Sequence, residues 1–326
     1  MPVLNESPQL LISSSANVLP FIKYCEKQKV DWLSIAHKSG IRRDLLMSLE
    51  WYMSRDLMRF VQLLSLETTP TLGIDVAMES TLNEIAPDIA RLVANVGSLE
   101  QALSIVIESM NVLNSHVKFW AERIDGHWFI CHMASIPKHA AGFSQAEWYR
   151  TGCIIKLCRH FYGQNWFPHE IRVAGDDTPD VVKRLRAVKH IEFGEPFGAI
   201  LVGEQSRFDP VDQYASTMDW QEATFKLLSN YALLPNMSIE RFCHVVGLSK
   251  RTLQRRLKEN GHSFKQLKET FRQEAASRLL RETALSIEEI GWKVGYNDLS
   301  NFNRAFKGWA GVSPAVYRDS KRHSLA

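Results

Sequence analysis

The C-terminal part of the sequence contains one unit twice, and this repeat is the strongest constraint on the fold. The first copy, "SIERFCHVVGLSKRTLQRRLKENGHS", begins at Ser238, and the second, "SIEEIGWKVGYNDLSNFNRAFKGWAGVS", begins at Ser286. The Ser-Ile-Glu triplets and the glycines Gly247 and Gly295 are offset by 48 residues. Two single insertions then move the later matches to offsets of 49 and 50. A duplicated unit of this length predicts a duplicated supersecondary structure.

Each copy has the pattern of a helix, a tight turn and a second helix. Ser238 and Ser286 are good helix N-caps, and glutamates follow them in the first turn, where the helix dipole favours negative charge. Gly247 and Gly295 then supply the left-handed backbone that ends the first helix. The pattern predicts helix-turn-helix units over about 238–260 and 286–309.

The second helix of each copy has a narrow apolar stripe that can pack on the first helix. The stripe consists of Leu253 and Leu257 in the first copy and of Phe302 and Phe306 in the second. Between the copies, "SFKQLKETFRQEAASRLLRE" has apolar residues at helical spacing and predicts one long connecting helix. We therefore expect an all-α C-terminal domain with two helix-turn-helix units joined by a long helix.

The segment "LSKRTLQRRLKENG", residues 248–261, is unusually cationic. Five basic residues lie between positions 250 and 258: Lys250, Arg251, Arg255, Arg256 and Lys258. On a helix, one polar stripe spanning about 140° collects the following residues: Lys250, Arg251, Gln254, Arg255 and Lys258. Such a stripe can be a solvated surface, which is the common case. The duplicated unit instead favours a face that projects outward to contact a polyanion.

Charge is unevenly distributed along the chain. From Leu234 to the end there are 17 Lys and Arg against 9 Asp and Glu, whereas the first 233 residues hold 22 against 27. Lys and Arg that replace condensed counterions on phosphates gain free energy whatever the base sequence. Two units with exposed second helices also fit two successive major grooves, about 34 Å apart. We expect double-stranded DNA as the partner.

These residues resemble the DNA-binding domain of AraC/XylS-type bacterial transcription regulators. The resemblance covers about residues 232–320 and includes "SIEEIGWKVGYNDLSNFNRAFKGWAGVSPAVYR" over its whole length. It implies a fold of seven helices and base contacts from Arg251, Gln254 and Arg255. Arginine can pair with guanine and glutamine with adenine, in agreement with that assignment. Lys250 and Lys258, at the edges of the stripe, are expected to contact phosphates.

The corresponding exposed positions of the second unit carry less charge. They are Leu299, Ser300, Asn303 and Arg304. We expect the first unit to supply most of the sequence discrimination and the second mainly to hold register on the duplex. An arginine at a repeated position can instead pair with a nearby carboxylate and serve the fold, and this alternative applies more to Arg304 than to Arg255.

The first 233 residues predict an α+β domain with an antiparallel sheet. Helical periodicity occurs in several segments, including residues 43–66 and 81–96. Two runs rich in aromatic and β-branched residues flank Asp125-Gly126, which predicts a hairpin. A helix is expected at about 144–162, followed by strands in "EIRVAG" and "GAILVG".

This region resembles the amino-terminal domain of the ornithine-utilisation-regulator branch of the same family rather than the cupin sensor. The resemblance covers about residues 18–205 and implies binding of a small-molecule effector, amino-acid-like or related; it identifies no pocket residue. We expect an effector-binding domain at 1–205, a linker with a linker helix at 206–233, and the DNA-binding domain at 234–326.

Other classes of protein lack support in the sequence. No run of 18 apolar residues exists and the first basic residue is Lys23, so we expect a cytoplasmic protein without a membrane segment. Five cysteines without a C-x-x-C motif indicate reduced thiols, no metal site and no cofactor. His127, Cys131 and His132 cannot all share one strand face, and no G-x-G-x-x-G, P-loop or G-x-S-x-G motif occurs. We expect no enzyme.

The sequence therefore predicts a sequence-specific transcription regulator controlled by a small-molecule effector, with RNA polymerase and a second copy of the chain as further partners. The alternative is a DNA-binding regulator whose first domain binds no ligand and only dimerises or contacts a partner. A catalytic domain fused to a DNA-binding module is a third class, and no catalytic grouping of residues supports it.

Overall fold

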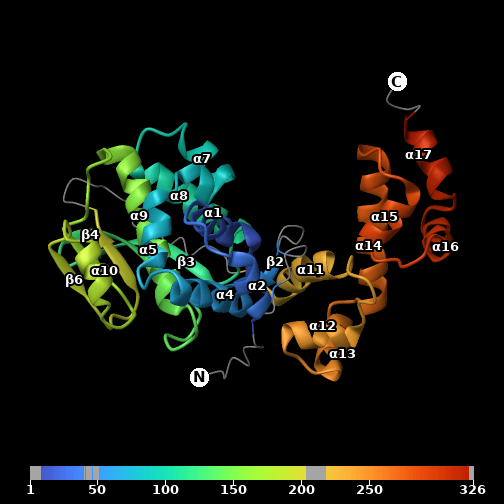
Figure 1. The fold of residues 1–326 in the computed structure, drawn as a ribbon, viewed down its shortest axis with the longest axis horizontal. Coiled ribbons are helices and arrows are strands. Elements are labelled where there is room, and N and C mark those ends of the chain that lie inside the picture. Colours follow the sequence, from blue (N-terminus) through green and yellow to red (C-terminus); the bar gives the residue numbers. More distant parts are fainter. Residues whose placement is uncertain (1–8, 40, 42–45, 47–50, 203–217, 323–326) are drawn as a thin grey trace. The chain divides into compact units, whose positions relative to one another are not determined.

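The computed structural model describes residues 9–39, 41, 46, 51–202 and 218–322. The chain divides into two compact units, Met1–Asp219 and Trp220–Ala326, which follow one another along the colour scale of Figure 1. Each unit has a buried apolar cluster of its own. Of the expected linker at 206–233, residues 206–217 lie outside the described residues.

The first unit begins with a small two-stranded sheet. Strand β1 (Ile12–Ser14) pairs antiparallel with β2 (Trp51–Met53), and between them lie η1 (Ser15–Val18), α1 (Leu19–Lys27) and α2 (Trp32–Lys38). The predicted helix at 43–66 is thus wrong at Trp51–Met53 and correct from α4 (Ser54–Glu67) onward. All three β2 side chains are buried, and pairing with β1 satisfies the strand's backbone, so the tertiary contact overrides helical periodicity. Residues 43–45 and 47–50 of the segment lie outside the described residues.

A helical layer follows β2. It contains α4, α5 (Leu72–Glu79), α6 (Leu82–Ile85), α7 (Pro87–Val93), α8 (Leu99–Ser109) and the short η2 (Met110–Val112). The segment 81–96, predicted to be helical, contains two helices because Pro87 lacks an amide hydrogen and starts α7 as its first residue.

The main sheet has five strands in the order β3-β4-β7-β5-β6. The strands are β3 (Val117–Ile124), β4 (His127–Ala134), β5 (Glu170–Arg172), β6 (His190–Glu192) and β7 (Gly198–Leu201). The hairpin predicted at Asp125-Gly126 is confirmed, with φ of 50° and 86° at the two turn residues, as a two-residue turn with left-handed backbone requires.

The sequence predicts an antiparallel sheet, and this prediction is wrong for one pair of strands. Strands β5 and β6 pair in parallel, while β3-β4, β4-β7 and β5-β7 are antiparallel. The reason is the crossover from β5 to β6 through α10 (Pro179–Arg184), since parallel neighbours need a connection of about a dozen residues or more. The unit is thus a mixed α/β structure.

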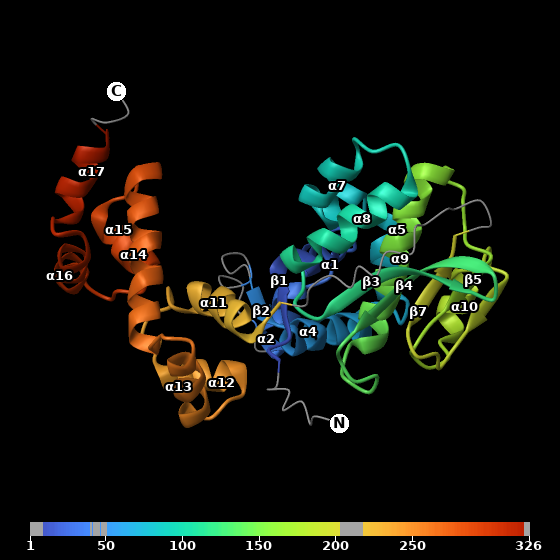
Figure 2. The same ribbon diagram turned by 180° about the vertical axis from the view of Figure 1, so that it is seen from behind.

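Helix α9 (Phe143–Tyr162) is the central element of the first unit and confirms the helix predicted at 144–162. It contacts both β7 and α5, as Figures 1 and 2 allow the reader to follow. Trp148, Ile155 and Cys158 of α9 are almost fully buried in the large apolar cluster of this unit. Side chains of α9 therefore meet the interior along most of the helix.

The second unit is helical throughout the described residues 218–322. Its helices are α11 (Trp220–Tyr231), α12 (Ile239–Val246), α13 (Lys250–Glu259), α14 (Phe264–Glu282), α15 (Ile287–Lys293), α16 (Leu299–Ala310) and α17 (Pro314–Arg322). We call α12 with α13 the first helix pair and α15 with α16 the second helix pair. Helix α14 connects them, with the pairs near its two ends (Figure 1).

The cysteines are free thiols, as predicted, and four of the five are buried. In the described part of the chain, no helix combines the length and the apolar character that a membrane span needs. Within the same residues, no cluster of three or more His, Cys, Asp or Glu side chains is arranged to bind a metal ion.

Candidate nucleic-acid interface

The first helix pair forms from the local signals that the sequence contains. The hydroxyl of Ser238 accepts a hydrogen bond from the amide of Arg241 at 3.3 Å and caps α12. Gly247, with φ of 71°, ends α12 in the left-handed conformation. The hydroxyl of Ser249 then accepts a hydrogen bond from the amide of Thr252 at 3.1 Å and caps α13. The predicted capping residues are confirmed here.

The apolar side of α13 fixes which side faces solvent. Leu253 and Leu257 are fully buried, and the ring of Phe242 on α12 lies 5.7 Å from that of Phe264 on α14. Each such buried side chain stabilises the fold by about 1.5–3 kcal/mol relative to an exposed one. The opposite side of α13 is exposed, and it carries Lys250, Arg251, Gln254, Arg255 and Lys258.

Arg256 differs from the other four cations of α13. Its side chain is buried, and its guanidinium lies 5.2 Å from the ring centre of Trp220 on α11. Guanidinium groups stack favourably on indole faces. Arg256 therefore belongs to the packing of α13 on α11, and the cationic stripe of α13 has four positive charges.

Two of these four cations have acidic neighbours. The ammonium of Lys250 donates a hydrogen bond to the carboxylate of Glu240 on α12 at 2.7 Å, which lowers the pKa of Glu240 to about 2 and raises that of Lys250. Arg255 lies 3.9 Å from Glu259 one turn later on the same helix. Arg251 and Lys258 form no ion pair with any described residue, and the Gln254 side chain makes no hydrogen bond within the same residues. These three side chains can donate to an external acceptor at once.

The second helix pair repeats the capping of the first. Ser286 and Glu289 form a reciprocal capping box, with hydrogen bonds of 2.7 and 3.1 Å, at the start of α15. The carboxylate of Asp298 accepts a hydrogen bond from the amide of Asn301 at 2.7 Å and caps α16. Phe302 and Phe306 are fully buried. The two copies of the sequence unit thus form two similar helix pairs.

The exposed side of α16 is less polar and less charged than that of α13. Ser300 and Arg304 are exposed, Leu299 is 39% exposed, and Asn303 is partly buried. Within the described chain, Arg304 forms no ion pair. The geometry therefore gives no support to the alternative in which Arg304 serves the fold by pairing with a carboxylate.

A buried arginine on α14 was not singled out from the sequence. Arg272 donates hydrogen bonds to the carbonyl oxygens of Ala232 at 2.8 Å and Leu234 at 3.1 Å, at the end of α11, and lies 5.0 Å from the ring centre of Tyr296. It thereby connects three elements of the unit. Helical periodicity does not distinguish a buried arginine on α14 from an exposed one, so no signal in the sequence identifies Arg272.

Known proteins match parts of this chain. A family of helix-turn-helix domains matches residues 242–320. The ornithine utilization regulator of Pseudomonas aeruginosa is 33% identical over 110 residues, which are 32% of this chain and 32% of that protein. The predicted resemblance of the C-terminal unit to AraC/XylS-type regulators is confirmed. The expected relationship to the ornithine utilization regulator is confirmed over those 110 residues, while the resemblance of residues 18–205 to its amino-terminal domain stays a prediction.

Two further proteins are similar to part of this chain. An uncharacterized HTH-type transcriptional regulator of Mycobacterium tuberculosis is 38% identical over 95 residues, 28% of this chain and 26% of that protein. The solved C-terminal domain of AraT, a response regulator from Geobacillus stearothermophilus, is 33% identical with a TM-score of 0.29, covering 30% of this chain and 81% of that domain. The matched segment spans only about a quarter to a third of the length of the full-length relatives. Those relatives are transcriptional regulators and not enzymes.

Proposed function

We propose that this protein regulates transcription by binding specific DNA sequences through residues 234–326, under the control of a small-molecule effector bound within residues 1–205. The observation that carries the first half is the exposed stripe of α13, on which Arg251, Gln254 and Lys258 have no partner within the described residues. Side chains with unused donors on a basic surface are suited to phosphates and base edges.

Both helix pairs act as helix-turn-helix units in this proposal, with α13 and α16 in successive major grooves. The connecting α14 has 19 residues. At 1.5 Å per residue a helix of that length spans about 28 Å. Successive major grooves on one face of DNA are separated by about 34 Å. The length of α14 is therefore close to the separation that the two helix pairs need.

The contacts divide into two classes. Arg251, Gln254 and Arg255 contact base edges from α13, with Lys250 and Lys258 on phosphates at the edges of the stripe. From α16, the contacting residues are Leu299, Ser300, Asn303 and Arg304. With four cations on α13 and only Arg304 in the α16 set, the first pair supplies most of the discrimination.

Footprinting on a DNA site selected from a random pool with the full chain tests this arrangement. The expected result is two protected segments on one face of the duplex, with their centres one helical turn apart. Protection of less than one turn would contradict binding by both helix pairs. A log–log plot of affinity against salt is expected to fall with a slope of several units, since each neutralised phosphate contributes about −0.9.

The effector half of the proposal is supported by two cavities in the first unit. They have volumes of about 110 and 100 Å³ and share Asn17, Asn114, Val117, Tyr149 and Arg150 in their linings. A first domain that only dimerises or contacts RNA polymerase has no need of such cavities, and consistent absence of binding heat with any metabolite would favour that alternative.

A further inference from the structure

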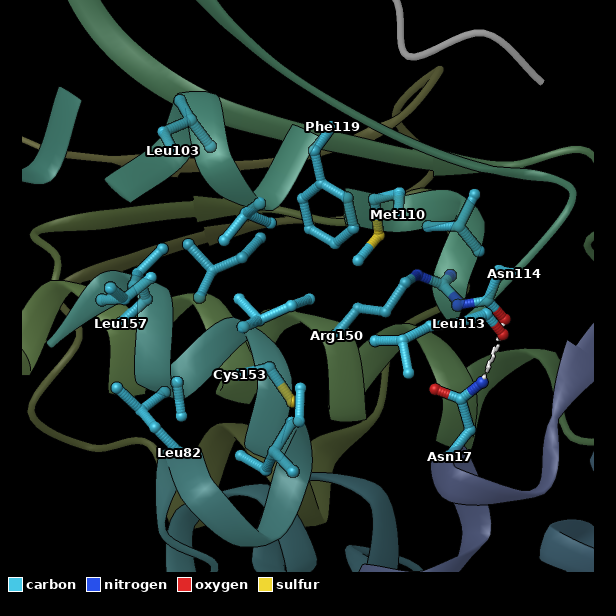
Figure 3. A pocket seen from close by; sticks show the side chains of 18 of the residues that line it. Asn17, Leu82, Leu103, Met110, Leu113, Asn114, Phe119, Arg150, Cys153 and Leu157 are labelled. Carbon is cyan, nitrogen blue, oxygen red and sulfur yellow. Dashed lines mark hydrogen bonds between the residues drawn. The ribbon is translucent and has the colours of Figure 1, made fainter. Parts of the chain in front are cut away.

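The larger cavity of the first unit is lined almost entirely by apolar side chains. Helices α6, α7, α8 and α9 and strand β3 surround it, and Figure 3 shows these side chains converging on one space. Its lining includes Leu82, Ile89, Leu103, Val106, Phe119 and Leu157. A surface of this kind stabilises an apolar ligand by removing its hydrocarbon from water.

One cation extends into this apolar space. Arg150, on the central helix α9, lines both cavities, and its guanidinium lies on the side where Asn114 and Asn17 are found (Figure 3). Its Nε donates to Nδ1 of His132 at 3.4 Å. Among the described residues, no carboxylate lies within 4.0 Å of the guanidinium. Burial lowers the pKa of Arg150, yet a guanidinium stays protonated in proteins.

The nearest titratable groups form no direct ion pair with Arg150. Glu147, one turn earlier on α9, uses its two carboxylate oxygens to accept hydrogen bonds from the amides of Ala174 at 2.7 Å and Gly175 at 2.8 Å. His116 and His132 are both buried, which lowers their pKa values and leaves them uncharged at neutral pH. The Glu147 carboxylate acts on Arg150 only through space, and a buried charge without a hydrogen-bonded counter-charge is costly to the folded state. Such a group is often retained for a ligand.

A second polar group in the cavity has only a weak partner. The Tyr149 side chain is buried, and its hydroxyl makes no hydrogen bond of normal length within the described residues. The thiol of Cys153 interacts with it electrostatically but is only a weak hydrogen-bond partner. Nearby, the Asn17 side chain donates to Oδ1 of Asn114 at 3.2 Å. Tyr149, Arg150 and the two asparagines thus place polar groups at one end of an otherwise apolar cavity.

We propose that this cavity binds an organic acid, with its carboxylate paired to Arg150 and its hydrocarbon body among the aliphatic side chains of α6, α7 and α8. The inference rests on the proposed effector function and names the chemical class of the effector. No aspartate or glutamate occurs among the described residues that line either cavity. An amino group on the ligand would have no counter-charge there, so a simple carboxylic acid fits better than the amino-acid-like effector expected from the sequence.

Calorimetry and thermal melting of the full chain test this assignment with octanoate, octanamide, octylammonium and 2-aminooctanoate. Octanoate is expected to bind and raise the melting temperature. Octanamide is expected to bind about 10- to 100-fold more weakly, as for the loss of a charge-assisted hydrogen bond. Octylammonium and 2-aminooctanoate are expected to bind least. Equal binding of octanoate and octanamide, or no binding of octanoate, overturns the inference.

Two variants locate the carboxylate. Arg150→Gln is expected to bind octanoate about 10- to 100-fold more weakly, because it removes the cation that pairs with the carboxylate. Lys156→Gln on the same helix also removes one cation but lies outside both linings, so it is expected to bind octanoate normally. Full affinity in Arg150→Gln overturns the inference. If that variant does not fold, the ligand series in the unaltered chain still decides.

Binding to the selected DNA site, measured with and without octanoate, separates this inference from the proposed function. Arg150-dependent octanoate binding that leaves DNA affinity unchanged supports the ligand class and counts against effector control. A DNA affinity that responds to some other metabolite, with no binding of carboxylic acids, supports the regulator and overturns the inference.

Discussion

The carboxylate of Glu240 on α12 lies 2.7 Å from the ammonium of Lys250 on α13, at the edge of the stripe proposed to contact DNA. Both groups are solvent-exposed, so the pair adds little to stability. Its effect is on the interface, because Glu240 occupies Lys250 and repels an approaching phosphate.

Glu240→Gln is therefore expected to raise DNA affinity severalfold at low ionic strength, since rim charges act mainly on association. Glu274→Gln removes one negative charge from the exposed side of α14 and serves as the matched control, with a smaller effect. The measurement is fluorescence anisotropy with the selected site. Weaker binding by Glu240→Gln would show that the pair orients Lys250 for the phosphate instead.

Arg251→Ala is expected to lower specificity as well as affinity. A bidentate pair to a base edge discriminates by about 1–3 kcal/mol. Lys258→Ala is expected instead to weaken binding to all sequences alike and to reduce the salt slope by about 0.9. Site selection from a random pool with each variant distinguishes the two effects. If Asn303→Ala changed the selected sequence while Arg251→Ala did not, the proposed ranking of the helix pairs would be reversed.

Gly295→Ala is expected to destabilise the C-terminal unit by about 2 kcal/mol or more, the size typical of a strained backbone with a steric clash. Gly295 has φ of 86°, and an added Cβ would lie 2.5 Å from the Arg272 guanidinium and 2.8 Å from the Leu233 carbonyl oxygen. Gly308, inside α16 with open space around it, is the matched position. Gly308→Ala is expected to stabilise by about 0.5–1 kcal/mol. Urea unfolding followed by circular dichroism compares the two.

The stability of the first unit is expected to fall as the pH is lowered from 7 to 5. Burial lowers the pKa of His116 from 6.5 to about 3, so the unfolded chain binds a proton in this range that the folded chain does not. The stabilisation is complete above the unfolded value and is lost progressively below it, by about 2 kcal/mol between pH 7 and pH 5 for this one residue.

Urea unfolding followed by tryptophan fluorescence at both pH values measures this loss. His116→Gln, which cannot take up a proton, is expected to show a shallower dependence on pH. An identical pH dependence in the variant would mean that His116 is accessible to protons in the folded state.

Much of the C-terminal unit could be predicted because its signals are local. Ser249 and Asp298 cap helices in the structure through their own sequence neighbours, and Gly247 turns the chain by its own φ. The burial of Arg256 and Arg272 could not be predicted. Each is explained by an aromatic ring from another helix, Trp220 or Tyr296, and helical spacing contains no information about such contacts.

The first unit was predicted less completely for a related reason. The hairpin at Asp125-Gly126 follows from the turn residues alone. Strands β2, β5 and β6 have three residues each, too few to show a period of two, and their pairing depends on distant parts of the chain. Arg150 lines a cavity that forms only when four helices and a strand pack together, so its proposed role could not be predicted from the sequence.

In the proposed function, the single connecting helix α14 limits which operators this protein could use. Changing the length or the twist of an uninterrupted helix is costly. Inserting one residue into α14 would rotate the helices that follow it by about 100° and displace them by about 1.5 Å. A site with one base pair more or less between its two contacted segments would consequently have to be accommodated by bending or twisting the DNA. Selection should then fall on flexible steps, such as TA or CA, in the base pairs that the protein never touches.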